Sequence, residues 1–136
     1  MADAITDLLC DAQDYQGGKA HSFILGSGRF IADKHRDFML ELLHSSGKSK
    51  VELTILGHSL GAGAASIAAM ELNALNDPRI SAKAVGFGCP ALLSKGLAEK
   101  SDFITTVIND ADVVPRLSGV AFANLVLNVL EFDWLP

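Results

Sequence analysis

Residues 50–72 read KVELTILGHSLGAGAASIAAMEL, and this stretch decides the fold. A short apolar and β-branched run, residues 51–56, is typical of a buried strand, and it ends at Gly57. From Ser59 to Asn73 the sequence is built from Ala, Gly and Leu, which favours a helix whose small side chains pack closely on a sheet. The stretch therefore predicts a strand, a tight turn at Ser59 and a helix.

The rest of the chain continues this alternation of strands and helices. We expect strands over 82–88 and 103–109, helices over 27–44 and 119–132, a short helix or turn over 91–99, and a helical turn over 3–10 before the Gly17-Gly18 break. Alternating strands and helices imply a mostly parallel sheet. The predicted fold class is α/β, with a mostly parallel sheet and helices on both faces, and residues 1–136 form a single domain.

Composition excludes several classes of function. The formal charge is −5 and no run of Lys or Arg occurs, so no nucleic-acid partner is expected. Cys10 and Cys89 are far apart in sequence and have no second Cys or His at ligand spacing. They are expected to be reduced, buried thiols, and neither a disulfide nor a metal site is predicted.

The sequence contains no recognisable targeting or membrane-spanning segment. Its first residues carry three Asp and no basic region, so no signal peptide is predicted. The apolar stretch VAFANLVLNVL, 120–130, is too short to span a bilayer and is interrupted by Asn124 and Asn128. We expect a cytoplasmic or membrane-peripheral chain, whose apolar C-terminal helix packs against further protein or contacts a membrane surface.

The serine of GHSLG has the surroundings that a catalytic nucleophile needs. A serine at a strand-to-helix turn is held in a strained conformation that lifts its hydroxyl above the sheet edge. Gly57 and Gly61 are expected to be required because side chains there would collide with the turn and its neighbouring strand. The backbone N–H of Leu60, at the start of the helix, is the expected donor to an oxyanion formed beside Ser59.

A carboxylate is available at the same edge of the predicted sheet. Asp110 and Asp112 follow the strand predicted over 103–109, and a carboxylate there lies at the same sheet edge as Ser59. The order serine then acid suits an α/β fold. Position favours Asp112, but spacing alone leaves both residues open, and either Asp can instead belong to a solvated turn.

A histidine base is harder to place. No His follows Asp112, and all four histidines precede Ser59. His58 is expected to leave the turn in another direction and to pack or form a hydrogen bond, and two further histidines, His35 and His44, are expected to be solvated on a surface helix. His21 follows the Gly17-Gly18 break and could approach the sheet edge.

Five stretches together carry a resemblance to a known family. They are ADAITDL (2–8), GGKAH (17–21), LTILGHSLGAGAAS (53–66), GFGCPAL (86–92) and NDADVVPRLS (109–118). In these motifs the chain resembles class 3, or fungal-type, lipases, and most closely the branch that includes sn-1-specific diacylglycerol lipases. The resemblance covers nearly the whole chain.

The resemblance implies a fold, an activity and roles for individual residues. It implies an α/β-hydrolase fold and hydrolysis of ester bonds in acylglycerols or other lipid esters, with no cofactor. By matching motif, Ser59 is the nucleophile, Asp112 the triad acid and the Leu60 amide one oxyanion donor, while Gly57, His58 and Gly61 complete the elbow. The resemblance also selects Asp112 over Asp110.

The chain departs from the family pattern at its two ends. The family has an RG(T/S) stretch before the DxxTDL segment and a catalytic histidine well after the D-x-VP segment, and neither is present here. We therefore expect the chain to be a truncated domain, incomplete at both ends. The first hypothesis is a serine lipase whose histidine lies outside this chain; the alternative is an inactive lipase-like fragment that binds lipid or a partner.

Overall fold

A three-stranded parallel sheet forms the base of the structure. The computed structural model describes residues 11–117 and 119–132. The sheet has the order β3 (Val51–His58), β4 (Ile80–Phe87) and β5 (Ile104–Val107). His58, Phe87 and Val107 are in register as its last row, so the carboxyl ends of all three strands meet at one edge.

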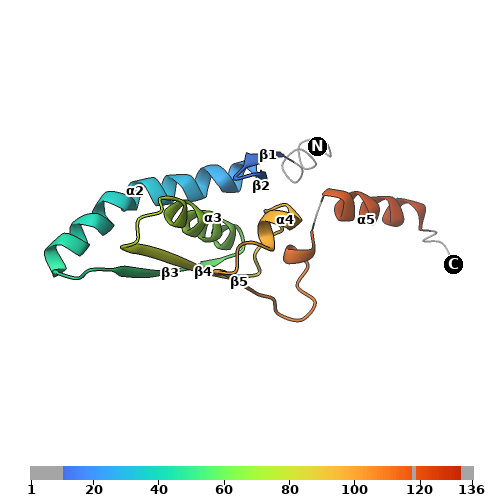
Figure 1. Ribbon diagram of the computed structural model, residues 1–136. Coiled ribbons are helices and arrows are strands. Elements are labelled where there is room, and N and C mark those ends of the chain that lie inside the picture. The colour runs from blue at the N-terminus through green and yellow to red at the C-terminus, as the bar shows by residue number, and fades with distance from the viewer. Residues whose placement is uncertain (1–10, 118, 133–136) are drawn as a thin grey trace.

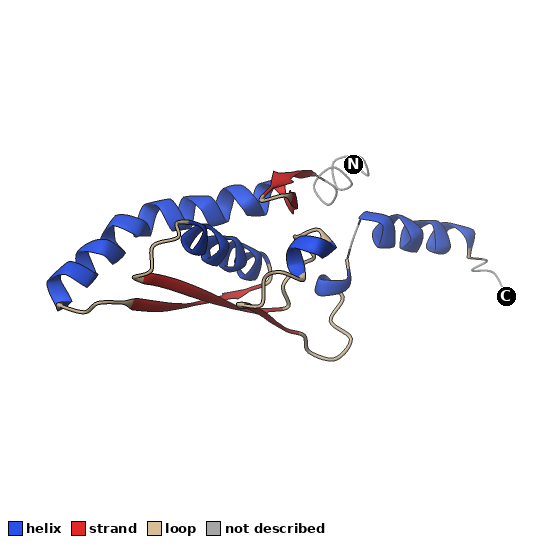
Figure 2. Ribbon diagram, viewed as in Figure 1, coloured by secondary structure: helices blue, strands red, loops and turns tan. Residues whose placement is uncertain are grey.

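Two helices lie in successive layers over one face of this sheet. Helix α3 (Leu60–Ala74) packs on β3 and β4, and the long helix α2 (Ser22–Ser46) packs on α3 (Figures 1 and 2). The predicted α/β class and parallel sheet are confirmed. On the opposite face, alternate residues of β3 are exposed, and the helices described cover only the α3 side. The expected second helical layer is therefore not part of the described structure.

Small and apolar side chains explain the packing of α3. Ten of the eleven positions from Ala62 to Leu72 are buried, all except Glu71, and most of the ten carry Ala or Gly. Such a helix can approach both the sheet and α2 closely because its side chains occupy little space. The Asn73 side chain then ties the end of α3 to β4, since its amide donates to the Ala82 carbonyl and its oxygen accepts from the Ala82 N–H, each at 2.9 Å.

A β-hairpin that the sequence did not lead us to expect precedes α2. Strands β1 (Ala12–Tyr15) and β2 (Gly18–His21) pair antiparallel. The two residues between them, Gln16 and Gly17, both have positive φ, 45° and 79°. This is the pattern of a type I′ turn, which matches the natural twist of a two-residue hairpin.

Three shorter elements complete the described chain. They are α4 (Lys95–Ala98), the 3₁₀ turn η1 (Val114–Arg116) and α5 (Gly119–Glu131). Figure 1 shows α5 beyond α4 and away from the sheet. None of the helices described is both long enough and apolar enough to cross a membrane. The helical turn expected over residues 3–10 and the thiol of Cys10 lie outside the described residues.

Candidate active site

Ser59 stands at the junction of β3 and α3 in an unusual backbone conformation. Its φ is 53° and its ψ is −124°, a combination that residues with side chains rarely adopt. Gly57 makes this sharp turn possible, because a Cβ at that position would lie 2.2 Å from the Gly61 carbonyl oxygen. The strand-to-helix turn expected at Ser59 is thus present.

Gly61 does not have the steric role that the sequence suggested. Apart from its chain neighbours and the adjoining backbone of its own helix, a Cβ added there would meet no described atom within 4 Å. The expectation of a collision at Gly61 was therefore wrong. The reason is that Gly61 takes part in the close contact through its backbone oxygen, which faces Gly57.

The first turn of α3 begins directly after Ser59. The Ser59 carbonyl accepts the Ala62 N–H at 3.0 Å and the Gly63 N–H at 3.4 Å. Leu60 is the first residue of the helix, and the amide at that position has no acceptor within the helix. The Leu60 amide therefore lies where the positive end of the helix dipole favours a negative charge.

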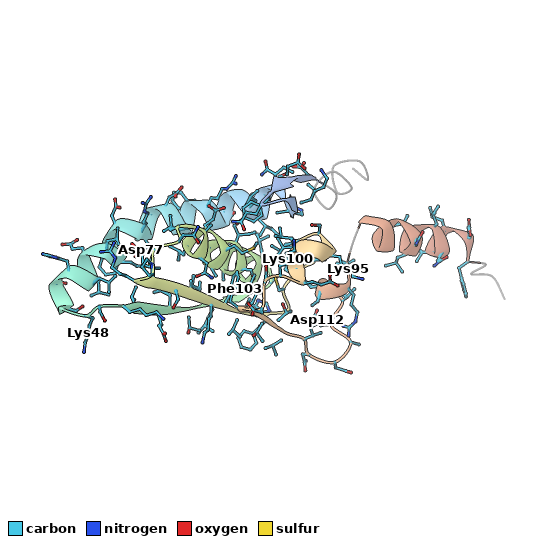
Figure 3. The ribbon with its side chains drawn as sticks, in the orientation of Figure 1. Lys48, Asp77, Lys95, Lys100, Phe103 and Asp112 are labelled. Atoms are coloured by element: carbon cyan, nitrogen blue, oxygen red, sulfur yellow. The ribbon has the colours of Figure 1, made fainter. Side chains whose placement is uncertain are left out.

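The acid candidates lie in the loop that follows β5. Asp110 is exposed and has a φ of 44°, whereas Asp112 is half-buried. The Asp112 Oδ1 accepts the Val114 N–H at 3.0 Å, and the Asp112 N–H donates to the Asn109 carbonyl at 2.9 Å. Figure 3 shows Asp112 at the end of the sheet opposite Asp77.

The turn after β4 lies between the serine and the acid loop. The Ser59 N–H donates to the Phe87 carbonyl at 2.9 Å, and the Gly88 N–H donates to the Val107 carbonyl at 2.9 Å. Gly88 has a φ of 57°, and a Cβ there would lie 2.8 Å from the Asp112 Oδ2. Ser59 therefore borders Phe87 and the Asp112 carboxylate borders Gly88, two adjacent residues at the carboxyl edge of the sheet.

The histidines occupy three different environments. His35 and His44 are exposed on α2, as expected for a surface helix. His58 is exposed on the face of the sheet opposite α3, since strand alternation turns it away from Gly57. His21 ends β2 and is half-buried, and its backbone N–H donates to the Leu92 carbonyl at 2.9 Å, which places this residue against the segment after Gly88.

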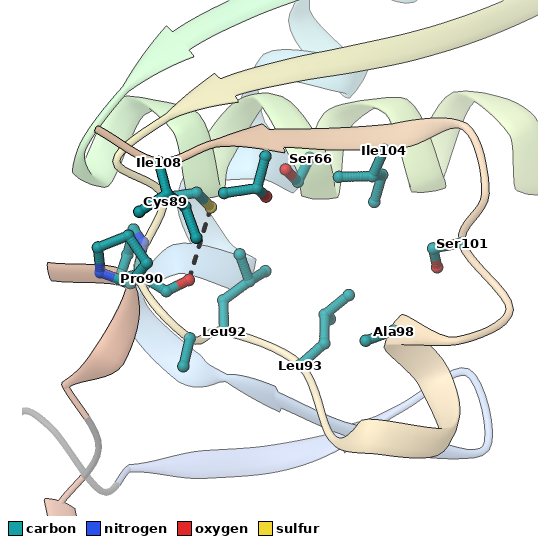
Figure 4. A pocket seen from close by; sticks show the side chains of 12 residues that line it. Ser66, Cys89, Pro90, Leu92, Leu93, Ala98, Ser101, Ile104 and Ile108 are labelled. Carbon is teal, nitrogen blue, oxygen red and sulfur yellow. Dashed lines mark hydrogen bonds between the residues drawn. The ribbon is translucent and has the colours of Figure 1, made fainter. Parts of the chain in front are cut away.

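An apolar cavity of about 350 Å³ lies on the α3 side of β5. Figure 4 shows Cys89 and Ile104 on one side of this cavity and Leu92 and Leu93 on the other. Ser59 and Asp112 are not among its lining residues. Cys89 is buried, as the sequence predicted, and burial raises the pKa of its thiol, with a smaller opposing contribution from the Ser66 hydroxyl.

Two residues that shape the site were not singled out from the sequence. They are Gly88, which leaves room for the Asp112 carboxylate, and Arg116, whose guanidinium donates to the carbonyl oxygens of Asp110 and Asp112. In the sequence they appear only as a Gly at the end of a predicted strand and as the Arg of VPRL, and their contacts with the Asp112 loop can be recognised only in the folded structure. In the described part of the chain, no group of three or more His, Cys, Asp or Glu could hold a metal ion.

Comparison with known proteins identifies relatives of this chain. The family model described as Lipase (class 3) matches residues 2–122. Diacylglycerol lipase-beta of Mus musculus is 35% identical over 142 residues, covering 96% of this chain and 20% of that protein. Phospholipase A(1) DAD1, chloroplastic, of Arabidopsis thaliana is 29% identical over 98 residues, covering 69% of this chain and 22% of that protein.

A solved structure agrees with these relatives. The crystal structure of a lipase from Rhizopus microsporus var. chinensis superposes with a TM-score of 0.67 at 27% identity, covering 88% of this chain and 44% of that lipase. The chain therefore spans about a fifth of the length of the two curated relatives and less than half of this solved lipase.

Proposed function

The chain belongs to the class 3 lipase family, and we propose that it carries the nucleophile and the acid of a serine hydrolase acting on carboxylic esters of acylglycerols. The observation that carries this proposal is the backbone of Ser59, which has positive φ at a strand-to-helix junction that only glycine at position 57 permits. Such strain is retained where it holds a reacting group in place.

In the proposed mechanism Ser59 attacks the acyl carbonyl of the ester. The Leu60 N–H stabilises the oxyanion that forms, because the start of α3 offers amides without intrahelical acceptors. Asp112 orients a histidine that takes the proton of the serine and then returns it to the leaving alcohol. Val114 already occupies the Asp112 Oδ1, so the Oδ2, beside Gly88, is the oxygen assigned to that histidine.

The base is proposed to come from outside these 136 residues, with His21 as the candidate within them. His21 lies against Leu92, four residues after Gly88, whereas His35 and His44 are on α2 and His58 is on the opposite face of the sheet. A His21→Gln variant separates these two sources. Labelling of Ser59 that survives the change assigns the base to another segment or chain.

The substrate class follows from the relatives and is a proposal for this chain. One relative is named a diacylglycerol lipase and another a phospholipase A(1), and both names denote hydrolysis of glycerolipid acyl esters. Release of fatty acid from diacylglycerol and from phosphatidylcholine in mixed micelles would test this class. A preference for water-soluble short esters over both lipids would contradict it.

Reaction with a fluorescent fluorophosphonate tests the nucleophile. In a protein that supplies the catalytic histidine, we expect labelling and hydrolysis of a short-chain ester, and Ser59→Ala should lose both properties. Ser27→Ala, on α2, is the matched control and should behave like the unchanged chain. Asp112→Asn should slow the reaction by roughly 10⁴-fold, as the same change of a triad acid does. Absence of labelling in a folded protein that contains the histidine would favour the alternative, an inactive lipase-like protein that binds lipid or a partner.

A further inference from the structure

One side chain joins the two ends of the acid loop. The Nη2 of Arg116 donates to the Asp110 carbonyl at 3.0 Å, and its Nη1 donates to the Asp112 carbonyl. Arg116 is the last residue of η1 and is exposed, so it is not held there by burial. Its planar guanidinium offers several donors in a fixed geometry, which suits the bridging of two oxygens.

The loop that Arg116 joins needs such a support. Asp110 has a φ of 44°, a conformation that is costly for a residue with a side chain, and both Asp110 and Ala111 are exposed. Little apolar packing is therefore available to hold this turn in place. Hydrogen bonds from a charged donor are stronger than those between neutral groups, so Arg116 can fix it.

The position of the Asp112 carboxylate depends on this loop. Its Oδ1 accepts the Val114 N–H, and its Oδ2 lies in the space that a side chain at position 88 would fill. Both contacts require the backbone of residues 112–114 to keep its present course. Arg116 holds that backbone at the Asp112 carbonyl, two bonds from the carbon that carries the side chain.

We propose that Arg116 is a positioning residue that aims the Asp112 carboxylate at the turn shared with Ser59. This inference rests on the proposed function, in which Asp112 is the triad acid. Arg116 touches neither substrate nor the reacting atoms and acts only through the loop. Lysine keeps the charge but lacks the planar fork, so Arg116→Lys should retain only part of the effect.

Hydrogen exchange of single amides in the whole chain tests the positioning directly. In Arg116→Met we expect the Val114 amide to exchange at least about tenfold faster, because its acceptor, the Asp112 Oδ1, is no longer held. The Ser59 amide, which donates to Phe87, should keep its rate. An unchanged Val114 rate would overturn the proposal. Should the Met variant lose protection throughout, Arg116→Lys, with a smaller acceleration expected, decides between the same two outcomes.

A matched control comes from the other end of the sheet. Arg79 is also exposed and also makes several hydrogen bonds within a turn, but it precedes β4 at the amino edge. Arg79→Met removes the same charge and should leave the exchange of the Val114 amide unchanged. An equal acceleration of Val114 in this variant would show a general loss of stability and would overturn the assignment to Arg116.

A double-mutant cycle tests whether Arg116 acts through Asp112. The rate of Ser59 phosphonylation is compared in the unchanged chain, Arg116→Met, Asp112→Asn and the double variant. We expect Arg116→Met to slow the reaction at least about tenfold and the double variant to be no slower than Asp112→Asn, because coupled residues are not additive. Additive losses would overturn the proposal.

The same cycle separates failure of this inference from failure of the proposed function. If Asp112→Asn slows phosphonylation and Arg116→Met does not, the acid assignment stands and the role of Arg116 is refuted. If Asp112→Asn has no effect, the proposed role of Asp112 as the triad acid is refuted, and so is any effect of Arg116 on catalysis.

Discussion

At the scale of single residues, the two glycines of the GxSxG motif differ in what they do for the site. The sequence led us to Ser59, Leu60 and Asp112 because a strand, a GxSxG turn and a helix form a local pattern. It did not distinguish Gly57 from Gly61, although only Gly57 lies in a space that a side chain cannot enter. Pattern alone cannot make this distinction, because the obstacle at Gly57 is a carbonyl oxygen placed there by the folded turn.

Gly57→Ala is the sharpest test of that distinction. The added Cβ would lie 2.2 Å from the Gly61 oxygen, and both partners are backbone atoms that cannot move without opening the turn. We expect a loss of more than about 3 kcal/mol in the free energy of unfolding, measured by urea denaturation.

A second glycine provides the control for this substitution. Gly26 lies within α2, and a Cβ there would meet no described atom within 4 Å. Gly26→Ala should therefore raise the free energy of unfolding by up to about 1 kcal/mol through helix propensity. Equal effects of the two substitutions would contradict the steric role assigned to Gly57.

At the scale of elements, long periodic segments were predicted well and short strands were not. The helix expected from Ser59 to Asn73 is α3, Leu60–Ala74, and the helix expected over 119–132 is α5, Gly119–Glu131. The β1–β2 hairpin was missed because four-residue strands show no clear alternation, and its turn has Gln-Gly where the usual signal is Asn-Gly. Because the hairpin was missed, nothing in the sequence marked its end as the start of α2. That helix begins at Ser22, five residues before the expected start at Ser27.

The turn between α3 and β4 should make stability depend on pH. Asp77 accepts three hydrogen bonds from Arg79, and these bonds lower the pKa of its carboxyl from 3.8 to about 2. A carboxylate whose pKa is lowered by folding stabilises the folded state above its unfolded pKa, and this contribution decreases below pH 3.8 and is lost as the pH falls through the folded pKa of about 2. The Asp77 carbonyl also accepts the N–H of Ile80, the first residue of β4.

Asp77→Asn should therefore lower the urea midpoint near neutral pH. The difference from the unchanged chain should shrink as the pH falls through about 2, because below that pH the carboxyl is protonated in both folded and unfolded states. Arg79→Gln removes the partner, and in that background the effect of Asp77→Asn should lose most of its pH dependence. A difference that stays constant over this pH range would contradict the assignment.

At the scale of the whole molecule, the open face of the sheet is the feature that the sequence reading did not anticipate. Apolar strand residues were interpreted as covered on both sides, but α2 and α3 lie on one side only (Figure 1). Leu56, Phe87 and Val107 are exposed by 67%, 46% and 41% on the other side. Phe87 is in register with Val107, and Leu56 lies two residues earlier along the sheet, in register with Val85, so the exposed apolar side chains gather near the carboxyl edge of this face.

This surface, together with the edge of β3 that has no paired strand in the described structure, predicts association between copies of the chain. Light scattering over a dilution series should show a mass that rises with concentration. Leu56→Ser with Phe87→Ser should weaken the association at least about tenfold, because apolar area is no longer removed from water. The matched control, Leu42→Ser with Phe38→Ser, changes exposed side chains of α2 and should leave the association unchanged. A single unchanging mass for the unaltered chain would show that neither the open face nor the free edge drives assembly.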